Sequence, residues 1–267
     1  LSSIDCKKHA CYLIVLETIA ANLGSMLTPI GNPQNLFLYT KMNTTLLSFC
    51  SVLLPYTIFS FVVLCFLVLL IPSKAVKTDI EGKRELPAHK FPKYFVVIYT
   101  VLFVMCLCCV FRIVPSWCVA LITLITIFFL DRKLLLQVDY MLLLTFCAFF
   151  VFTGNMGNIE VIKTFLKSIV SENEFWVGIL SSQIISNVPA ALLLEPFASS
   201  QRNLLLGVNV GGLGSLVASL ASLISYKIYV NSLGKELHDR KYMLYFTLIS
   251  IVFLVPLCFM YFVIHSH

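Results

Sequence analysis

The stretch that decides the fold is ANLGSMLTPIGNPQN, residues 21–35, which interrupts a run of apolar sequence. A second stretch, VNVGGLGSLVASLAS at residues 208–222, interrupts another apolar run. A shift of 187 positions (209 minus 22) places Asn22 on Asn209. The same shift superimposes further small or polar residues: Gly24 on Gly211, Thr28 on Ser215, Gly31 on Ala218, Asn32 on Ser219 and Asn35 on Ser222. Broken helices survive in lipid only where protein or a watery cavity satisfies their backbone, so corresponding breaks in two halves predict a transporter binding site.

The composition is that of an integral membrane protein. Of the 267 residues, 59% are hydrophobic and 12% are charged, and the mean hydropathy is +0.94. A soluble domain carries about 25% charged residues. Most of the ten cysteines lie in apolar runs, which is typical of small buried residues. The sequence contains neither HExxH nor GxxxxGK[ST] and no nucleic-acid-binding patch. We therefore expect no enzyme, no cofactor and no nucleic-acid partner.

Apolar runs predict where the chain crosses the membrane, since about 20 residues span the hydrocarbon. The predicted segments are Cys11–Leu27 continuing at Ile30–Tyr39, Leu46–Ile71, Tyr94–Phe111, Val114–Leu130, Leu134–Thr153, Phe175–Phe197, Leu204–Ile228 and Tyr242–Ile264. Residues 158–171 place apolar and charged side chains on opposite faces, which predicts an amphipathic helix in the interface. The Phe175–Phe197 run is broken at Ser186-Asn187-Val188-Pro189, which predicts a re-entrant hairpin.

Basic residues set the predicted orientation. The loops at residues 73–93 and 227–241 hold most of the Lys and Arg, so both are expected in the cytoplasm. They reach the same side only if residues 175–197 form a hairpin that enters and leaves on one side. The first broken segment then runs outward and the second inward, which predicts inverted repeats.

The breaks are predicted to hold the chemistry. Exposed N–H groups at the start of a half-helix suit an anion, and unwound carbonyls suit Na⁺. Ser215 is expected to cap the half-helix after the second break. After the first break, Thr28 before Pro29 and Asn32 before Pro33 are equally good caps. The predicted binding residues are Asn22, Gly24, Ser25, Thr28, Asn32, Ser186, Asn187, Val188, Pro189, Asn209, Gly211, Gly212 and Ser215, with Na⁺ at Ser186, Asn187, Asn209 and Gly211.

Three acidic residues leave alternatives open. Glu17 lies in an apolar run, where it either couples to a cation or proton or sits near the inner surface. Glu195 is expected in the interface, and Asp139 either pairs with Arg132 and Lys133 or takes part in coupling. A single glycine-rich break can serve close helix packing alone. Two matching breaks beside a hairpin favour a binding site.

At these residues the chain resembles the ion transporter superfamily, which includes citrate transporters, divalent anion:sodium symporters, arsenite permeases and one type of sodium/proton antiporter. Residues 22–35 are similar to its NxGxxxTPIGNPxN motif, and Ser186-Asn187-Val188-Pro189-Ala190 to its Ser-Asn hairpin tip. Residues 138–144 are similar to its (I/V)DWxLLL span start, with Tyr140 replacing Trp. The resemblance implies a hairpin and a broken helix in each repeat, a sodium site between each tip and its broken helix, and substrate between the two.

The resemblance also sets the expected organisation. Residues 1–72 are the end of a first inverted repeat whose hairpin is expected before Leu1, residues 73–93 a cytoplasmic loop, and residues 94–267 the second repeat. We expect an all-α polytopic protein of the cytoplasmic (inner) membrane, with a re-entrant hairpin and discontinuous transmembrane helices. Its expected function is secondary transport of a small anion, a di- or tricarboxylate or an inorganic oxyanion, coupled to Na⁺ or H⁺. Alternatives are a sodium/proton antiporter, an arsenite-type efflux permease, or a channel or scaffold. Expected partners are the anion, the cation, lipid and a second copy in a homodimer.

Overall fold

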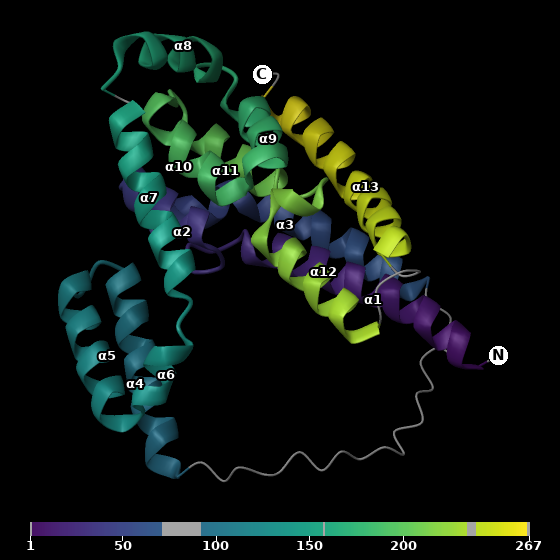
Figure 1. The fold of residues 1–267 in the computed structure, drawn as a ribbon. Helices are drawn as coiled ribbons and strands as arrows, with labels where there is room; N and C mark the ends of the chain where they lie inside the picture. Colours follow the sequence, from purple (N-terminus) through teal and green to yellow (C-terminus); the bar gives the residue numbers. More distant parts are fainter. Residues whose placement is uncertain (1, 71–91, 157, 234–238, 266–267) are drawn as a thin grey trace. The chain divides into compact units, whose positions relative to one another are not determined.

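The computed structural model describes residues 2–70, 92–156, 158–233 and 239–265 (Figure 1). These residues form helices and turns, with no strand among them, which confirms the all-α prediction. They divide into two compact units, Leu1–Thr78 with Cys147–His267, and Asp79–Phe146. The predicted basic loop at residues 73–93 lies almost wholly outside the described residues, so its side of the membrane stays a prediction.

The larger unit contains both predicted breaks and the predicted hairpin. Its helices are α1 (Ser2–Ser25), α2 (Pro33–Met42), α3 (Leu46–Leu69), α8 (Glu160–Val170), α9 (Glu174–Ile185), α10 (Asn187–Leu194), η2 (Glu195–Phe197), α11 (Gln201–Val210), η3 (Leu216–Ala218), α12 (Leu220–Leu233) and α13 (Asp239–His265). The smaller unit contains α4 (Lys93–Val110), α5 (Ser116–Leu130), α6 (Arg132–Gln137) and the first residues of α7 (Tyr140–Met156).

Several helices have the length and composition of membrane spans. Within the described residues, Leu46–Leu69, Lys93–Val110 and Arg240–His265 are long and apolar enough to cross a bilayer. Cys11–Ser25, Ser116–Leu130 and Glu174–Ile185 are shorter apolar helices. This pattern agrees with the predicted polytopic membrane protein. The amphipathic helix predicted at residues 158–171 is α8.

Two predicted boundaries are wrong. The predicted span Leu134–Thr153 is divided, because Oδ1 of Asp139 accepts the N–H of Leu142 at 2.9 Å and so caps a new helix, α7. No ion pair joins Asp139 to the neighbouring basic residues, all of which the structure describes. The polar loop predicted from Lys227 begins later, because α12 continues to Leu233. A long lysine stem lies along apolar surface without ending a helix.

The hairpin and the second broken helix pack backbone against backbone. In Figure 1, α9 lies beside α11. A Cβ atom on Gly207 of α11 would lie 2.4 Å from the carbonyl oxygen of Phe175 in α9, and one on Gly178 would lie 3.2 Å from the Gly207 carbonyl carbon. Glycine at these positions therefore permits the close approach. The first broken helix, α1, packs against α3, α12 and α13.

A cavity between two helix breaks

The hairpin turns at Ser186, as predicted. Helix α9 ends at Ile185 and α10 begins at Asn187, and Ser186 has φ 74° and ψ 153°. Positive φ is uncommon for a residue with a side chain, so the surrounding contacts hold this conformation. The Ser186 hydroxyl donates to the carbonyl of Ala218 at 3.4 Å. The first turn of α10 has no side-chain cap.

The first break separates α1 from α2 over residues 26–32. Asn32 caps α2, because its Oδ1 accepts the N–H of Asn35 at 2.9 Å and Pro33 is the first helical residue. The structure thus selects Asn32 over Thr28 as the cap. The carbonyl of Thr28 instead accepts the N–H of Gly31 at 3.2 Å. A Cβ atom on Gly31 would lie 1.8 Å from the carbonyl oxygen of Ser25, so this turn has no room for a side chain.

The second break separates α11 from α12 over residues 211–219. The prediction that Ser215 caps the following half-helix is wrong, because α12 begins only at Leu220. The hydroxyl of Ser219 accepts the N–H of Ala221 at 3.2 Å instead. The Ser215 hydroxyl donates to the carbonyl of Gln183 in the hairpin at 3.3 Å. Asn209, which we expected in unwound chain, lies in the last turn of α11.

Each break has an asparagine close to it. That asparagine forms hydrogen bonds with the other break, at the point where the second half of the broken helix begins. Near the first break, Nδ2 of Asn22 donates to the Ser222 hydroxyl at 3.0 Å, and the Ser219 hydroxyl donates to Oδ1 of Asn22 at 2.7 Å. The two partners come from the cap and the first turn of α12.

Asn209 makes the matching pair of contacts. Its Nδ2 donates to Oδ1 of Asn35 at 2.7 Å, and its Oδ1 accepts Nδ2 of Asn32 at 3.2 Å. A shift of 187 residues (209 minus 22, 219 minus 32) exchanges the two sets of contacts. Reciprocal contacts of this kind are typical of two segments related by a two-fold axis. They support the predicted repeats.

Gln183 is a site residue that the sequence argument missed. Its Nε2 donates to the carbonyls of Gly211 at 2.7 Å, Leu213 at 2.9 Å and Ile179 at 3.3 Å. Its Oε1 accepts the N–H of Ser215 at 2.8 Å. An amide in an apolar helix, one turn before the hairpin tip, was the available signal. The sequence of α11 and of the second break does not itself show that the backbone groups there need Gln183 as a partner.

A cavity of about 380 Å³ lies between the breaks and the hairpin tip. Its lining includes the first residues of three helices, α2, α10 and α12, and the last turns of α1 and α11. The lining residues are Ala21, Asn22, Ser25, Gly31, Asn32, Pro33, Gln34, Asn187, Val188, Asn209, Gly212, Ser219, Leu220, Ala221 and Ile224.

The cavity collects about half of the predicted binding residues. Those that line it are Asn22, Ser25, Asn32, Asn187, Val188, Asn209 and Gly212. Those that do not are Gly24, Thr28, Ser186, Pro189, Gly211 and Ser215. Glu17, the proposed coupling residue, is exposed on α1 and is not among the lining residues. Among the described residues, the lining contains no charged side chain.

Asn187 differs from the other asparagines of the cavity. The residue is only 6% exposed, and its side chain lies against Gly212, where a Cβ atom would be 2.9 Å from Nδ2. The amides of Asn22, Asn32 and Asn209 all bond to protein groups. The Asn187 amide makes no hydrogen bond to any residue that the structure describes. The amide of Gln34, which also lines the cavity and is 2% exposed, likewise makes no hydrogen bond to a residue that the structure describes. Because buried polar groups are almost always paired, these two amides are available to a ligand.

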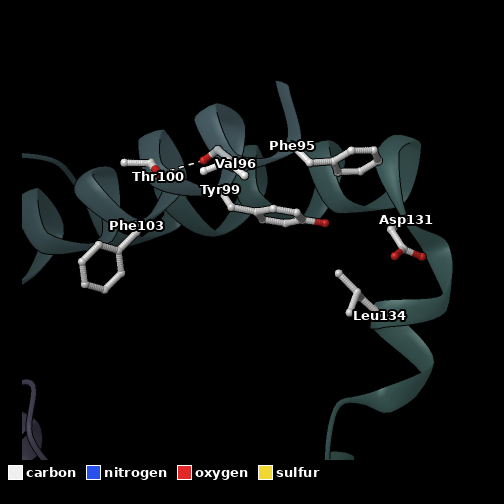
Figure 2. A pocket seen from close by; sticks show the side chains of 7 residues that line it. All are labelled: Phe95, Val96, Tyr99, Thr100, Phe103, Asp131 and Leu134. Atoms are coloured by element: carbon white, nitrogen blue, oxygen red, sulfur yellow. Dashed lines mark hydrogen bonds between the residues drawn. The ribbon is translucent and has the colours of Figure 1, made fainter. Parts of the chain in front are cut away.

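The smaller unit has its own hollow, of about 740 Å³, between α4 and the α5–α6 junction (Figure 2). Its polar groups serve the local backbone. The Thr100 hydroxyl donates to the carbonyl of Val96 at 2.7 Å, and Asp131 accepts the N–H of Lys133 at the start of α6. The remaining lining is apolar or aromatic, with Tyr99 extending toward Asp131 in Figure 2. Among the residues that the structure describes, the side chains of Tyr99 and Asp131 are the only polar pair that approach each other in this hollow.

A hairpin and two broken helices that enclose a polar, uncharged cavity, in a chain with several membrane-length helices, define a multi-pass membrane protein of the transporter type. A family model described as "Citrate transporter" matches residues 6–203, and the chain belongs to this family. It is a multi-pass protein of the inner membrane.

Two relatives agree with this assignment. An uncharacterized transporter of Methanocaldococcus jannaschii is 36% identical over 217 residues, covering 81% of this chain and 58% of the relative. The Escherichia coli inner membrane protein YbiR is 30% identical over 227 residues, with the same coverage of 81% and 58%. The chain therefore spans about 58% of the length of these relatives. No solved structure matches the chain.

Proposed function

We propose that the protein takes part in secondary active transport of a small anion of low charge across the inner membrane. The observation that carries this proposal is the convergence of three helix N-termini on one cavity, beside the unpaired amide of Asn187. Helix N-termini carry partial positive charge and unpaired N–H groups, which suit an anion. Membership of the citrate transporter family, and a relative named as an uncharacterized transporter, support transport as the role.

Helix α10 is the strongest of the three anion-binding ends. In α2 the N–H of Asn35 donates to the side chain of Asn32, and in α12 the N–H of Ala221 donates to the side chain of Ser219. No side chain caps α10, Pro189 has no N–H, and the N–H of Ala190 donates to the Ser186 carbonyl at 3.0 Å, so the N–H groups of Asn187 and Val188 remain for a ligand. The Asn187 side chain adds two further donors at the same end.

The charge of the substrate follows from the lining. Each helix N-terminus contributes at most about +0.5 charge, so three contribute at most about +1.5. The part of the chain that the structure describes places no lysine, arginine or histidine in this lining. A monoanion or dianion fits this field better than a tricarboxylate, which would leave more than one charge uncompensated. The last turns of α1 and α11 also reach the cavity. Their negative ends suit a coupling cation, Na⁺ or H⁺.

The test is uptake by the full-length protein in proteoliposomes, with a monocarboxylate, a dicarboxylate, a tricarboxylate and inorganic phosphate as labelled substrates. Each is measured under an inward Na⁺ gradient, an inward proton gradient and no gradient. We expect saturable, gradient-dependent uptake of a mono- or dianion and little uptake of the tricarboxylate. Unsaturable flux that ignores both gradients would indicate a channel, and a preferred tricarboxylate would contradict the charge argument.

Asn187→Asp sharpens the test by placing a carboxylate at the uncapped end of α10. Two like charges about 4 Å apart at an effective dielectric constant of 20 repel by about 4 kcal/mol. Uptake of a dianion should therefore fall at least about tenfold, and by more than uptake of a monoanion. The matched control is Asn203→Asp, in the first turn of α11 and outside the cavity lining. Equal effects of the two variants would count against the cavity as the anion site.

A further inference from the structure

A side-chain amide bridges the carbonyls of each helix break. In the second break, Nε2 of Gln183 lies 2.7 Å from the Gly211 oxygen and 2.9 Å from the Leu213 oxygen. In the first, Nδ2 of Asn35 lies 2.7 Å from the Met26 oxygen and 3.2 Å from the Thr28 oxygen. Carbonyls released by a break are the groups that coordinate cations in broken transmembrane helices. Here an uncharged NH₂ group occupies the position between them.

The orientation of the Gln183 amide is fixed by its partners. Carbonyl oxygens only accept hydrogen bonds, so the group that faces Gly211 and Leu213 has to be the NH₂. The backbone N–H of Ser215 only donates, so the group 2.8 Å from it has to be the oxygen. Both ends of the amide are thus engaged.

We propose that Gln183 is a built-in, uncharged substitute for a cation at the second break. It closes the break without an ion, so the carbonyls of Gly211 and Leu213 are not ligands of a coupling cation. Gln183 is then a specificity-determining residue, because a glutamate in its place would present a carboxylate to the same two carbonyls and create a cation site. The inference rests on the proposed function in one respect: if transport is coupled to a cation, groups other than these two carbonyls bind that cation.

The local geometry supports a fixed role for this side chain. Gly214 has φ 109°, and a Cβ atom there would lie 2.5 Å from Oε1 of Gln183. The chain therefore wraps closely around the amide, in a conformation that a residue with a side chain rarely adopts. The hairpin helix α9 and the break are joined at this point by both the side chain and the backbone carbonyl of Gln183.

Gln183→Glu tests the proposal with almost no change in shape. The full-length protein and the variant are compared by melting temperature in alkaline buffer, with choline chloride replaced stepwise by sodium chloride. In choline, the carboxylate faces two carbonyls with no donor between them, and we expect the variant to melt about 5 °C below wild type. Because Na⁺ binds only the folded site, most of this difference should disappear at high Na⁺.

The quantity compared is the difference in melting temperature between variant and wild type. Na⁺ binding elsewhere in the protein affects both proteins equally and does not change this difference. Acidic buffer should restore stability in the same way, since a protonated carboxyl regains a donor. The charged residues of α8, α9 and α11 are Glu160, Lys163, Lys167, Glu174 and Arg202, and none of them is hydrogen-bonded to Gln183; α10 and η3, which also pack against α9, contain no charged residue. The matched control is Gln137→Glu at the exposed end of α6, whose difference from wild type should stay near zero throughout.

A difference for Gln183→Glu that neither Na⁺ nor acid reduces would overturn the proposal, and so would a variant that folds in none of these conditions. Gln183→Met removes both polar ends at similar volume. It should lower the melting temperature in every buffer, with no response to Na⁺ beyond that of wild type. Wild-type stability of Gln183→Met would also overturn the proposal. Failure of wild-type uptake would refute the proposed function alone, because these melting temperatures require no transport.

Discussion

The first break, residues 26–32, and the second, residues 211–219, close the same kind of gap with different parts of the chain. Asn35, which bridges the carbonyls of the first break, belongs to the half-helix that follows that break. Gln183, which bridges those of the second, belongs to the hairpin. The first break is therefore closed by its own segment. The second is closed by α9, so it cannot change shape without moving the hairpin.

Equivalent glycines show the same difference. A Cβ atom on Gly24 would meet nothing within 4 Å. A Cβ atom on Gly211, the residue 187 positions later, would lie 2.8 Å from both the Ile179 Cα and the Gly207 oxygen. The hairpin helix occupies the space beside the second break that is open beside the first. Two breaks of similar sequence are thus packed unequally.

The largest expected effect breaks this comparison directly. Gly211→Ala forces a methyl group into backbone, and overpacking of this kind costs about 1–3 kcal/mol or more. We expect a fall of roughly 5–10 °C in the melting temperature of the 267-residue chain in detergent. Gly24→Ala should be neutral or slightly stabilising, because alanine favours a helix over glycine by about 1 kcal/mol.

Equal losses at the two glycines would show that their surroundings are alike, against the structure. A loss at Gly24 that appears only when the chain is extended to the length of its relatives would sharpen the comparison instead. It would show that a segment outside these residues packs on α1 as α9 packs on α11.

The next effect concerns the crossed asparagines. Asn209→Ala removes hydrogen bonds to Asn32, Asn35 and the Leu205 carbonyl. Hydrogen bonds inside membrane proteins average about 0.6 kcal/mol, so the loss should be about 2 kcal/mol, or roughly 4–8 °C in melting temperature. Asn203→Ala, on the same helix and outside the network, is the control. A melting temperature equal to that of the control would mean that the network does not hold the two breaks together.

The smallest effect is expected for Asn22→Ala. Asn22 makes two side-chain bonds, to Ser219 and Ser222, and is half-buried, whereas Asn209 is buried. By the same reasoning the loss is about 1 kcal/mol, or roughly 2–4 °C. Thermal melts of Asn22→Ala and Asn209→Ala, measured side by side, give the ratio of the two falls in melting temperature. If Asn22→Ala lowered the melting temperature more than Asn209→Ala, the result would contradict the expectation that the more deeply buried asparagine contributes more.

The sequence predicted the elements whose causes are local. The break at Ser186, the amphipathic helix α8 and the interruptions after Ser25 and Val210 follow from proline, glycine and hydrophobic spacing. Membership of the citrate transporter family agrees with the motif resemblance at residues 22–35. These features depend on a few neighbouring residues, which one sequence contains in full.

The contacts between the breaks were not predictable in this way. The choice of Asn32 as the cap, and the role of Gln183, depend on which groups distant parts of the chain bring within about 3 Å. Asn209 was expected to be a ligand beside Asn187, yet its amide is satisfied by Asn32 and Asn35. Asparagines that look equivalent in the sequence can be told apart only by the hydrogen-bond partners that the fold gives their amides.

The central claim is that Asn187 serves the ligand whereas Asn209 serves the fold, and one paired measurement tests it most directly. The half-saturation concentration for the transported anion and the melting temperature are measured for Asn187→Ala and Asn209→Ala in the full-length protein. We expect Asn187→Ala to raise half-saturation about five- to hundredfold, the equivalent of roughly 1–3 kcal/mol, with the melting temperature unchanged. Asn209→Ala should lower the melting temperature with a much smaller change in half-saturation. The reverse pattern, or normal half-saturation in Asn187→Ala, would contradict the account.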